Sequence, residues 1–356
     1  NNVQEAFCLM NKAMAQQQFH YTLSTEKDFK FDGDLKNIKY SKEIQNIKIG
    51  DKILKKGKWY PFQIIFIILN IKSFIDPLSD DRKIMDLIWF PTGGGKTEAY
   101  LGLSAFVIFL RKLIDPNKTG NAVIMRYTLR LLTTQQFLRA STLICACEKL
   151  RCENEDKLGK NEIGIGLWIG GEATPNTEDQ AKQILDSLYK QYSNLENKFL
   201  VINCPWCGAD MGPDATNYIS GFIPGYRKEK KIFVFSCENE KCNFSHKNNK
   251  NLPIDVIDER IYKKSPDLII GTIDKFATLP WRSEAIDCFT SNENKNSTDL
   301  IIQDELHLIS GPLGSVSGMY EICIKALTEK KIDNKIISAK IVGSTATISR
   351  AEKQIS

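Results

Sequence analysis

The sequence lacks the features that mark membrane and secreted proteins. No signal peptide opens it, and its longest apolar runs, at 64–69 and 101–110, are too short to cross a bilayer. Its ten cysteines do not have the spacing of a disulfide framework in a short secreted chain. We therefore expect a cytoplasmic protein with reduced thiols and no membrane partner.

The chain also lacks a strong charge of either sign. Its 48 basic and 43 acidic residues leave a net charge of +5. That charge permits a nucleic-acid partner without arguing for one, because dedicated binders are usually more basic. The first residue is Asn1 rather than methionine, so we expect a fragment or a processed chain. The 42% of apolar residues over 356 positions suffice for one large or two ordinary domains.

A glycine-rich stretch at 91–97 is the most informative part of the sequence. It lies between an apolar run of strand length at 83–88 and one of helix length at 99–110. This is the context of a phosphate-binding loop, in which backbone N–H groups and a helix N-terminus favour anionic oxygens. Lys96 would reach the β and γ phosphates of ATP, and the Thr97 hydroxyl would bind Mg²⁺.

The loop departs from the usual pattern at Phe90, which stands where the first glycine is expected. Gln63 begins the helical run before the loop, and its amide can both donate and accept toward an adenine edge. An incidental glutamine in a capped core helix is an equal alternative, and a chance glycine-rich turn is the alternative for the loop. The nucleotide contacts that we expect are Gln63, Thr92, Gly93, Gly94, Gly95, Lys96 and Thr97.

Hydrolysis at such a loop needs a carboxylate pair that follows a second buried strand. Asp304 and Glu305 follow a clean apolar run. Asp258 and Glu259 follow a shorter run that a charge interrupts, and we expect them to start a helix. We favour Asp304 as the Mg²⁺ ligand and Glu305 as the residue that orients or deprotonates the attacking water.

His307 completes an Asp-Glu-x-His pattern with these two acids. We expect it to connect the acids to a later segment that carries motion toward a nucleic-acid site. A buried histidine without a role in turnover is the alternative. The coupling segment is Ser344, Thr345, Ala346 and Thr347.

Four of the cysteines are paired by their spacing. Cys204 and Cys207 form a C-x2-C knuckle, and Cys237 and Cys242 form a C-x4-C pair. Four thiolates from two short loops predict a closed, structural Zn²⁺ site, since no position stays open for water. His246 could replace one ligand, and unbound thiols or a redox pair are the alternatives.

Strands alternate with helical patterns along the chain, which predicts an α/β fold with a parallel sheet covered on both faces. Residues 3–18 read as a helix before it. The interval from Lys96 to Asp304 is roughly twice what a minimal domain of this kind needs, which predicts an insertion. We expect an N-terminal extension at 1–58, the main domain at 59–150 and 263–356, and a zinc-bearing insertion at 151–262.

These motifs, in this order, resemble the first RecA-like half of a superfamily 2 DExH-box helicase. The matching segments are 91–97 for motif I, 128–130 for motif Ia, 170–171 for the glycine pair after it, 272–276 for motif Ib, 304–307 for motif II and 345–347 for motif III. Longer phrases at 91–100, 126–136, 204–208 and 302–314 are similar to DrmA-type helicases of the DISARM antiphage defence system. The resemblance implies a RecA-like parallel sheet with a zinc-ribbon insertion and an N-terminal helical extension.

The resemblance also implies an ATP-driven motor on nucleic acid, DNA by preference, with protein partners from the defence system. In such motors a second RecA-like domain carries the arginine fingers, and we expect no counterpart of it within these 356 residues. Such an arginine contributes about 10³–10⁵ in rate, so we expect little turnover from this piece alone. Expected nucleic-acid contacts are Arg130, Gly170, Gly171, Thr272 and Lys275. The alternatives are an ATP switch that recruits proteins without translocation and a non-enzymatic docking role for the zinc module.

Overall fold

The computed structural model describes residues 1–25, 57–91, 93–128, 130–190, 197–213, 221–230, 232–309 and 311–346, without the side chains of 24–25, 130–132 and 311–312. A seven-stranded sheet forms its centre, with the strand order β1-β11-β8-β2-β7-β3-β6. Every neighbouring pair in this sheet is parallel. The predicted α/β class, a parallel sheet with helices on both faces, is confirmed.

The strands of this sheet are β1 (Asp86–Trp89), β2 (Val123–Tyr127), β3 (Ile165–Trp168), β6 (Ile254–Asp255), β7 (Leu268–Thr272), β8 (Leu300–Gln303) and β11 (Lys340–Thr345). Two antiparallel hairpins stand outside it, β4 (Tyr226–Glu229) with β5 (Ile232–Phe235) and β9 (Lys330–Ile332) with β10 (Lys335–Ile337). The main helices are α1 (Asn2–Thr25), α4 (Pro61–Ile75), α5 (Lys96–Ile114), α6 (Arg130–Glu153), α8 (Glu178–Lys190), α9 (Asp258–Lys264) and α12 (Gly311–Thr328). Short turns of helix complete the chain: η1 (Asp80–Lys83), α7 (Glu155–Leu158), η2 (His246–Asn248), α10 (Ile273–Phe276), η3 (Leu279–Trp281), α11 (Ser283–Ile286) and η4 (Leu306–Leu308).

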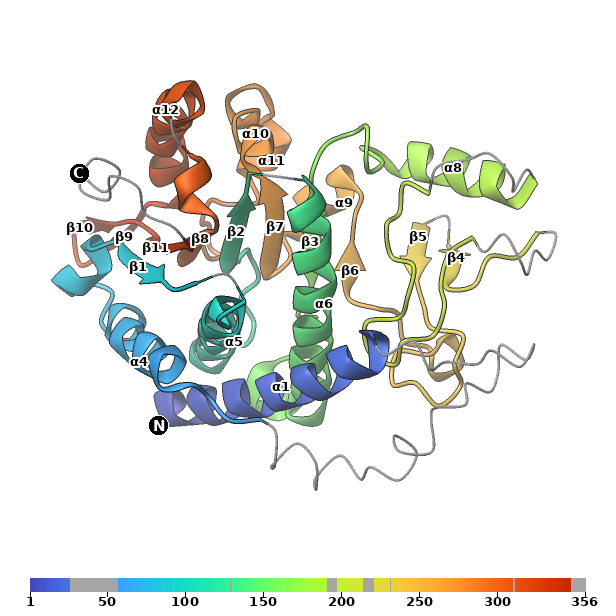
Figure 1. Ribbon diagram of the computed structural model, residues 1–356, viewed down its shortest axis with the longest axis horizontal. Helices are drawn as coiled ribbons and strands as arrows, with labels where there is room; N and C mark the ends of the chain where they lie inside the picture. Colours follow the sequence, from blue (N-terminus) through green and yellow to red (C-terminus); the bar gives the residue numbers. More distant parts are fainter. Residues whose placement is uncertain are drawn as a thin grey trace.

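The two faces of the sheet pack against different sets of helices, because successive side chains of a strand point to opposite sides. In β2, Val123 and Met125 belong to the larger core cluster with α1, α4, α5 and α6. Ile124 belongs to the smaller cluster, which includes Phe276 of α10 and Ile324 of α12. Figure 1 shows the result, with α10, α11 and α12 gathered at one end of the view and α1 and α4 at the other.

The composition of 336–348 predicts a single strand, and this prediction is wrong. β10 and β11 are separate elements and belong to different sheets. A tight turn with positive φ at Asp333 (45°) and Asn334 (63°) joins β9 to β10. Helix α12 was not predicted, because its first half is rich in glycine and serine. Asp258 and Glu259 do lie in the first turn of α9, as predicted.

The chain between β3 and β6 leaves the sheet and forms a separate lobe with α8 and the β4–β5 hairpin (Figure 1). This lobe is shorter than the expected insertion at 151–262, since β3 and β6 are themselves strands of the central sheet. The predicted N-terminal helix is present as α1 and continues to Thr25. None of the helices in the described part of the chain combines the length and apolar character that crossing a bilayer requires.

Candidate functional site

The glycine-rich loop connects the end of β1 to the start of α5, as the sequence predicts. Gly95 precedes the helix with φ of 85°, a left-handed conformation that glycine adopts at little cost. A Cβ atom at Gly95 would lie 2.7 Å from Nε2 of Gln63. The loop therefore requires glycine at this position for both its backbone conformation and its close approach to α4. Gly93 also has a positive φ, 77°, and Thr92 lies outside the described residues.

Phe90, the departure from the usual loop, has a structural role. Its ring stacks on Phe62 of α4, with 4.1 Å between the ring centroids. A Cβ atom at Gly94 would lie 2.6 Å from Cδ1 of Phe90. The aromatic ring thus fills the space beside Gly94 and fastens the loop to α4.

Lys96 points back toward the backbone of its own loop. Its Nζ lies 2.5 Å from the carbonyl oxygen of Phe90 and 3.5 Å from that of Pro91. These are neutral acceptors, so a phosphate would be a stronger partner for the same ammonium group. The side chain is mostly buried, which makes its charge more effective toward an anion in the loop.

Gln63 uses its amide within the protein. Its Nε2 donates to the carbonyl of Gly95 at 2.7 Å, and its Oε1 accepts from the N–H of Tyr60 at 2.8 Å. The second bond is half of a capping box at the start of α4. The amide therefore joins the helix to the phosphate loop, and adenine recognition by its remaining donor and acceptor stays a prediction.

The acid pair lies beside the phosphate loop, at the end of β8. Tyr100 of α5 connects the two: its hydroxyl lies 2.7 Å from Oδ2 of Asp304 and 3.1 Å from Oγ1 of Thr97. The two motifs predict that the loop and the acids lie on neighbouring strand tips, but β11 lies between β1 and β8. The carboxylate and the hydroxyl nevertheless converge, and oxygen ligands of these types are those that Mg²⁺ prefers.

Burial sets the protonation of this cluster. Burial raises the pKa of Tyr100 well above its usual value, and Tyr127 and Asp304 raise it further. Burial, followed by the charge of Asp304, likewise raises the pKa of Tyr127. Both phenols thus stay protonated. The pKa of Glu305 is also raised, first by burial and then by Asp304, so this carboxylate is a stronger base than an exposed glutamate.

His307 contacts both parts of the site that it was predicted to connect. Its Nδ1 lies 3.0 Å from Oγ1 of Thr345 and 3.3 Å from Oε2 of Glu305. Glu305 has φ of 48°, an uncommon conformation for a residue other than glycine, which turns the chain sharply after β8. Ser344 and Ala346 flank Thr345 at the end of β11, and Thr347 lies outside the described residues.

The expected nucleic-acid contacts differ in their surroundings. Gly170 follows β3 with φ of 108°. A Cβ atom at Gly171 would lie 2.4 Å from Nδ2 of Asn176. Thr272 ends β7 and is fully buried. The side chain of Arg130, at the start of α6, lies outside the described residues.

Lys275 is used inside the protein. Its Nζ lies 2.6 Å from Oδ2 of Asp258, and the two side chains are 7% and 1% exposed. The ammonium also lies over the ring of Trp168, 5.7 Å from its centroid. A phosphate could reach this group only if the ion pair opened, so the placement favours a structural role for Lys275.

The four predicted zinc ligands come together. The sulfur atoms of Cys204, Cys207, Cys237 and Cys242 lie within 4.8 Å of one another, and all four residues are buried. Four convergent thiols fit the donor set of a structural zinc site, and no disulfide joins them. Hydrogen bonds with the other three thiols hold the pKa of Cys207 well below its usual value, whereas burial raises the pKa of Cys204.

Backbone N–H groups support this cluster. The N–H of Asn239 donates to the sulfur of Cys237, and that of Phe244 donates to the sulfur of Cys242, both at 3.4 Å. His246, the alternative ligand, lies outside the cluster, with its Nδ1 3.5 Å from the carbonyl of Cys237. We refer to the two cysteine loops and the β4–β5 hairpin as the four-cysteine module.

Helix α1, which packs against α5 and α6, also contacts the four-cysteine module. The ring of His20 stacks on Trp206, with 3.5 Å between centroids, and its Nδ1 lies 2.5 Å from the Trp206 carbonyl. Burial lowers the pKa of His20 to about 4, so the imidazole is neutral at physiological pH. No sequence pattern indicates this contact, because the two residues are far apart along the chain.

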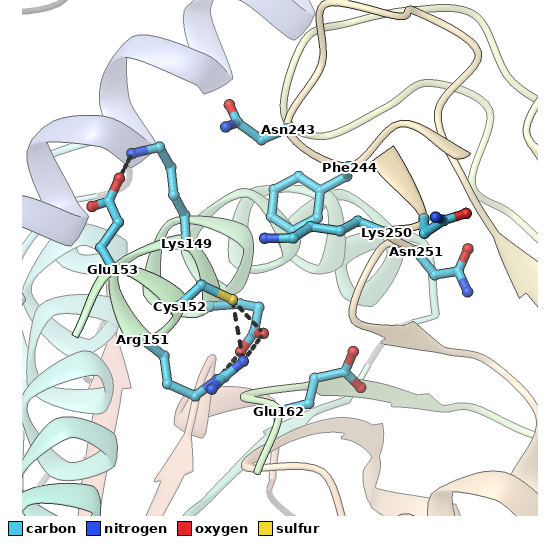
Figure 2. Close-up of a pocket in the computed structure, with 11 residues that line it drawn as sticks. Lys149, Arg151, Cys152, Glu153, Glu162, Asn243, Phe244, Lys250 and Asn251 are labelled. Carbon is cyan, nitrogen blue, oxygen red and sulfur yellow. Dashed lines mark hydrogen bonds and ion pairs between the residues drawn. The ribbon is translucent and has the colours of Figure 1, made fainter. Parts of the chain in front are cut away.

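A cavity of about 490 Å³ lies between α6 and the four-cysteine module and shares no lining residue with the phosphate loop (Figure 2). Its charges are largely matched within the protein. Arg151 donates to both carboxylate oxygens of Glu148, at 2.7 and 2.6 Å, and Lys149 pairs with Glu153. Burial raises the pKa of Cys152, which leaves a weakly reactive thiol. This cavity is a polar junction between two parts of the fold.

Tyr100 is the main site residue that sequence reasoning missed. A signal was present: it lies three residues after Thr97 on α5, and residues so spaced share one side of a helix. Its partner Asp304 could not be paired with it from the sequence, because the contact depends on how α5 packs against β8.

We compared the chain with family models and with curated proteins. No family model matches the chain. The DISARM protein DrmA of Bacillus paralicheniformis is 38% identical over 362 residues, which cover 89% of this chain and 31% of the relative. The chain thus spans less than a third of the length of this curated relative.

Three solved structures with a similar backbone fold are of helicase-type proteins. The Mycobacterium smegmatis helicase Lhr, bound to ssDNA and AMP-PNP, gives a TM-score of 0.39 at 15% identity. The match covers 84% of this chain and 26% of the Lhr chain. The DUF1998 helicase MrfA gives a TM-score of 0.40 at 12% identity, and the match covers 85% of this chain and 29% of the MrfA chain. A yeast DEAD-box splicing factor gives 0.43 at 10% identity, over 94% and 52%. Over 89% of its length, the chain is similar to a DISARM protein DrmA, as the phrases of its motifs predict.

Proposed function

We propose that this chain is the ATP-binding half of a nucleic-acid helicase or translocase that acts in antiphage defence. The observation that carries the proposal is the convergence of Thr97, which follows Lys96 in the phosphate loop, and Asp304 at the end of β8, bridged by the hydroxyl of Tyr100. Ligands of open parallel sheets bind at this edge. The similarity to a DISARM protein DrmA supports the biological setting.

In this proposal the chain's own groups divide the work. Lys96 leaves the carbonyls of Phe90 and Pro91 and binds the β and γ phosphates. Thr97 and Asp304 would hold Mg²⁺, which neutralises phosphate charge when it is bound. Glu305, whose pKa is raised by burial and by Asp304, accepts the proton of the attacking water.

His307 would transmit the state of the acids to β11, since it contacts both Glu305 and Thr345. Nucleic acid would lie along the strand ends, against the segments of Arg130, Gly170, Gly171 and Thr272. Contacts to the phosphate backbone there would be salt-dependent and largely independent of sequence. Lys275 would support this surface from within through Asp258.

We further propose that the main domain comprises 59–150 and 263–356 with the strands of the intervening segment, and that the four-cysteine module is its insertion. A second RecA-like domain would come from elsewhere in a longer protein, because the chain covers only 31% of its relative. That domain would supply the arginine fingers, and this chain alone would then turn over ATP very slowly.

Glu305→Gln in the full-length protein tests the proposal. We expect this variant to bind ATP like the wild type and to lower the steady-state ATPase rate by about 10²–10⁴, since a general base contributes that much. Glu293→Gln, at an exposed glutamate, is the matched control and should keep the wild-type rate. An unchanged rate in Glu305→Gln would contradict the assignment of the base.

Stimulation by nucleic acid distinguishes a motor from an ATP switch that recruits proteins. We expect single-stranded DNA to raise the ATPase rate of the full-length wild type, with a strong dependence on salt. A rate that is independent of added DNA and RNA would favour the switch.

A further inference from the structure

Tyr100 occupies an unusual place for a core tyrosine. Its ring is fully buried on α5 among the residues of the main core. Its hydroxyl does not end in that core but reaches the site, 2.7 Å from Oδ2 of Asp304 and 3.1 Å from Oγ1 of Thr97. One buried hydroxyl thus touches both residues that we expect to hold Mg²⁺.

The carboxylate of Asp304 is fixed from both sides. Its Oδ2 accepts from the Tyr100 hydroxyl, and its Oδ1 accepts from the N–H of Glu305 at 2.9 Å. Each oxygen has a second lone pair, which remains available for a metal or its bound water. The residue is only 6% exposed, so these two donors set the plane of the carboxylate with little competition from solvent.

We propose that Tyr100 is a positioning residue for Mg²⁺: its hydroxyl orients Asp304 and Thr97 so that the metal binds together with the nucleotide. The inference rests on the proposed function and adds to it a residue that lies outside the segment 91–97 matched to motif I. Groups that orient metal ligands typically contribute about 10–100-fold in metal affinity. Charge-assisted bonds to a carboxylate are also among the stronger hydrogen bonds, which suits this role.

Tyr127 of β2 provides a matched control. It is also a buried tyrosine, and its hydroxyl lies 3.5 Å from that of Tyr100. Within the described part of the chain it makes no hydrogen bond to Asp304 or Thr97. Removal of this hydroxyl therefore tests the loss of a buried phenol in the same cluster without the loss of a direct contact to the expected metal ligands.

The test is to measure binding of a fluorescent ATP analogue to the full chain as Mg²⁺ is varied. For Tyr100→Phe we expect the Mg²⁺ concentration at half-maximal binding to rise at least about 10-fold. Affinity in EDTA should change less than about twofold, because the phosphate loop itself is untouched. For Tyr127→Phe both quantities should stay within about threefold of the wild type.

The outcomes separate this inference from the proposed function. If the wild type fails to bind the analogue at any Mg²⁺ concentration, the proposed function is overturned. If the wild type binds and Tyr100→Phe shows the same Mg²⁺ dependence, or loses binding equally in EDTA, the positioning role is overturned. A Mg²⁺ shift that Tyr127→Phe reproduces in full would also overturn it, since the effect would then belong to the cluster.

Loss of folding in Tyr100→Phe would be detected by thermal melting in EDTA. In that case 3-fluorotyrosine placed at position 100 alone reports on the intact hydroxyl. Its ¹⁹F resonance should shift when Mg²⁺ is added to the nucleotide complex and should not shift when EDTA replaces Mg²⁺. A ¹⁹F chemical shift that does not change when Mg²⁺ is added would overturn the inference.

Discussion

The site at the strand ends and the four cysteines of the module differ in how their buried polar atoms are paired. In the module, four sulfur atoms converge with backbone N–H groups pointing at two of them. At the carboxyl ends of the adjacent strands β11, β8, β2 and β7, several buried side-chain atoms have no hydrogen-bond partner among the described residues. These atoms are Oγ of Ser344, Oε1 of Gln303, Nε of Arg126 and Oγ1 of Thr272.

This contrast is consistent with a supporting role for the four cysteines and a ligand-binding role for the strand ends. A closed set of four thiols leaves no position for a substrate, so the module can only support the fold or present a surface. Unpaired buried polar atoms destabilise a fold and require an explanation when they occur in a row. Their position at the edge where sheets of this class bind ligands is consistent with the proposed motor.

The largest effect should follow from the removal of one cysteine of the four-cysteine module. Cys207→Ser removes one of the four ligands and should abolish the binding of one zinc per chain. Because zinc binding contributes about 10–16 kcal/mol to the folding of small metal domains, the module should also unfold more easily. Metal analysis and limited proteolysis of the module measure the loss. Cys8→Ser, at an exposed cysteine, is the control. A Cys207→Ser protein that keeps stoichiometric zinc would contradict the assignment.

Lys275 forms a buried ion pair with Asp258, so its loss should lower stability as the loss of a zinc ligand does. Lys275→Ala leaves the buried carboxylate of Asp258 without its partner and should lower the free energy of unfolding by about 3–5 kcal/mol. Denaturant unfolding measures this change. Lys263→Ala, which breaks an exposed pair with Glu259, should cost less than about 1 kcal/mol.

Two further measurements sharpen this prediction. The double variant Lys275→Met with Asp258→Asn removes both charges and should recover part of the lost stability. A Lys275→Ala protein of wild-type stability that binds nucleic acid more weakly would instead support the direct contact first expected from the sequence.

The smallest effect concerns the contact of α1 with the module. His20 is neutral when folded, with its pKa lowered to about 4 by burial, whereas its ordinary value is 6.5. The folded state therefore binds fewer protons, and the contribution of His20 to stability is lost as pH falls from about 6.5 toward 4. From pH 7.5 to 6.0, the wild type should lose about 1 kcal/mol more stability than His20→Gln.

Denaturant unfolding of the zinc-loaded proteins at the two pH values measures this difference. The comparison with His20→Gln removes the contributions of other titrating groups, because both proteins share them. Equal losses in the two proteins would show that His20 is solvated rather than buried against Trp206.

Local patterns were enough to predict much of the site. A loop that must have glycine at a left-handed position, such as Gly95, and must lie between a strand and a helix is specified by neighbouring residues. The same holds for the cysteine knuckles, whose short spacing limits the geometry. These features depend on contacts within a few residues, so the sequence predicts them directly.

Sequence reasoning did not indicate the contacts that form between distant segments. The run 336–348 has strand composition throughout, but the hairpin with β9 takes its first part into another sheet. Lys275 has the sequence position of a nucleic-acid contact, but α9 presents Asp258 to it. Helix α12 forms despite its glycines and serines, with Arg126 of the sheet paired to Glu321.

The phosphate loop, the acid pair, the cysteine spacing and the alternation of strands and helices could all be read from the chain, because each depends on residues that are close together in it. The position of β11 between the loop strand and the acid strand, and the contact of Tyr100 with both Thr97 and Asp304, emerged from the three-dimensional fold alone. The physical reason is that strand order and side-chain contacts across the core depend on packing between segments that are about two hundred residues apart.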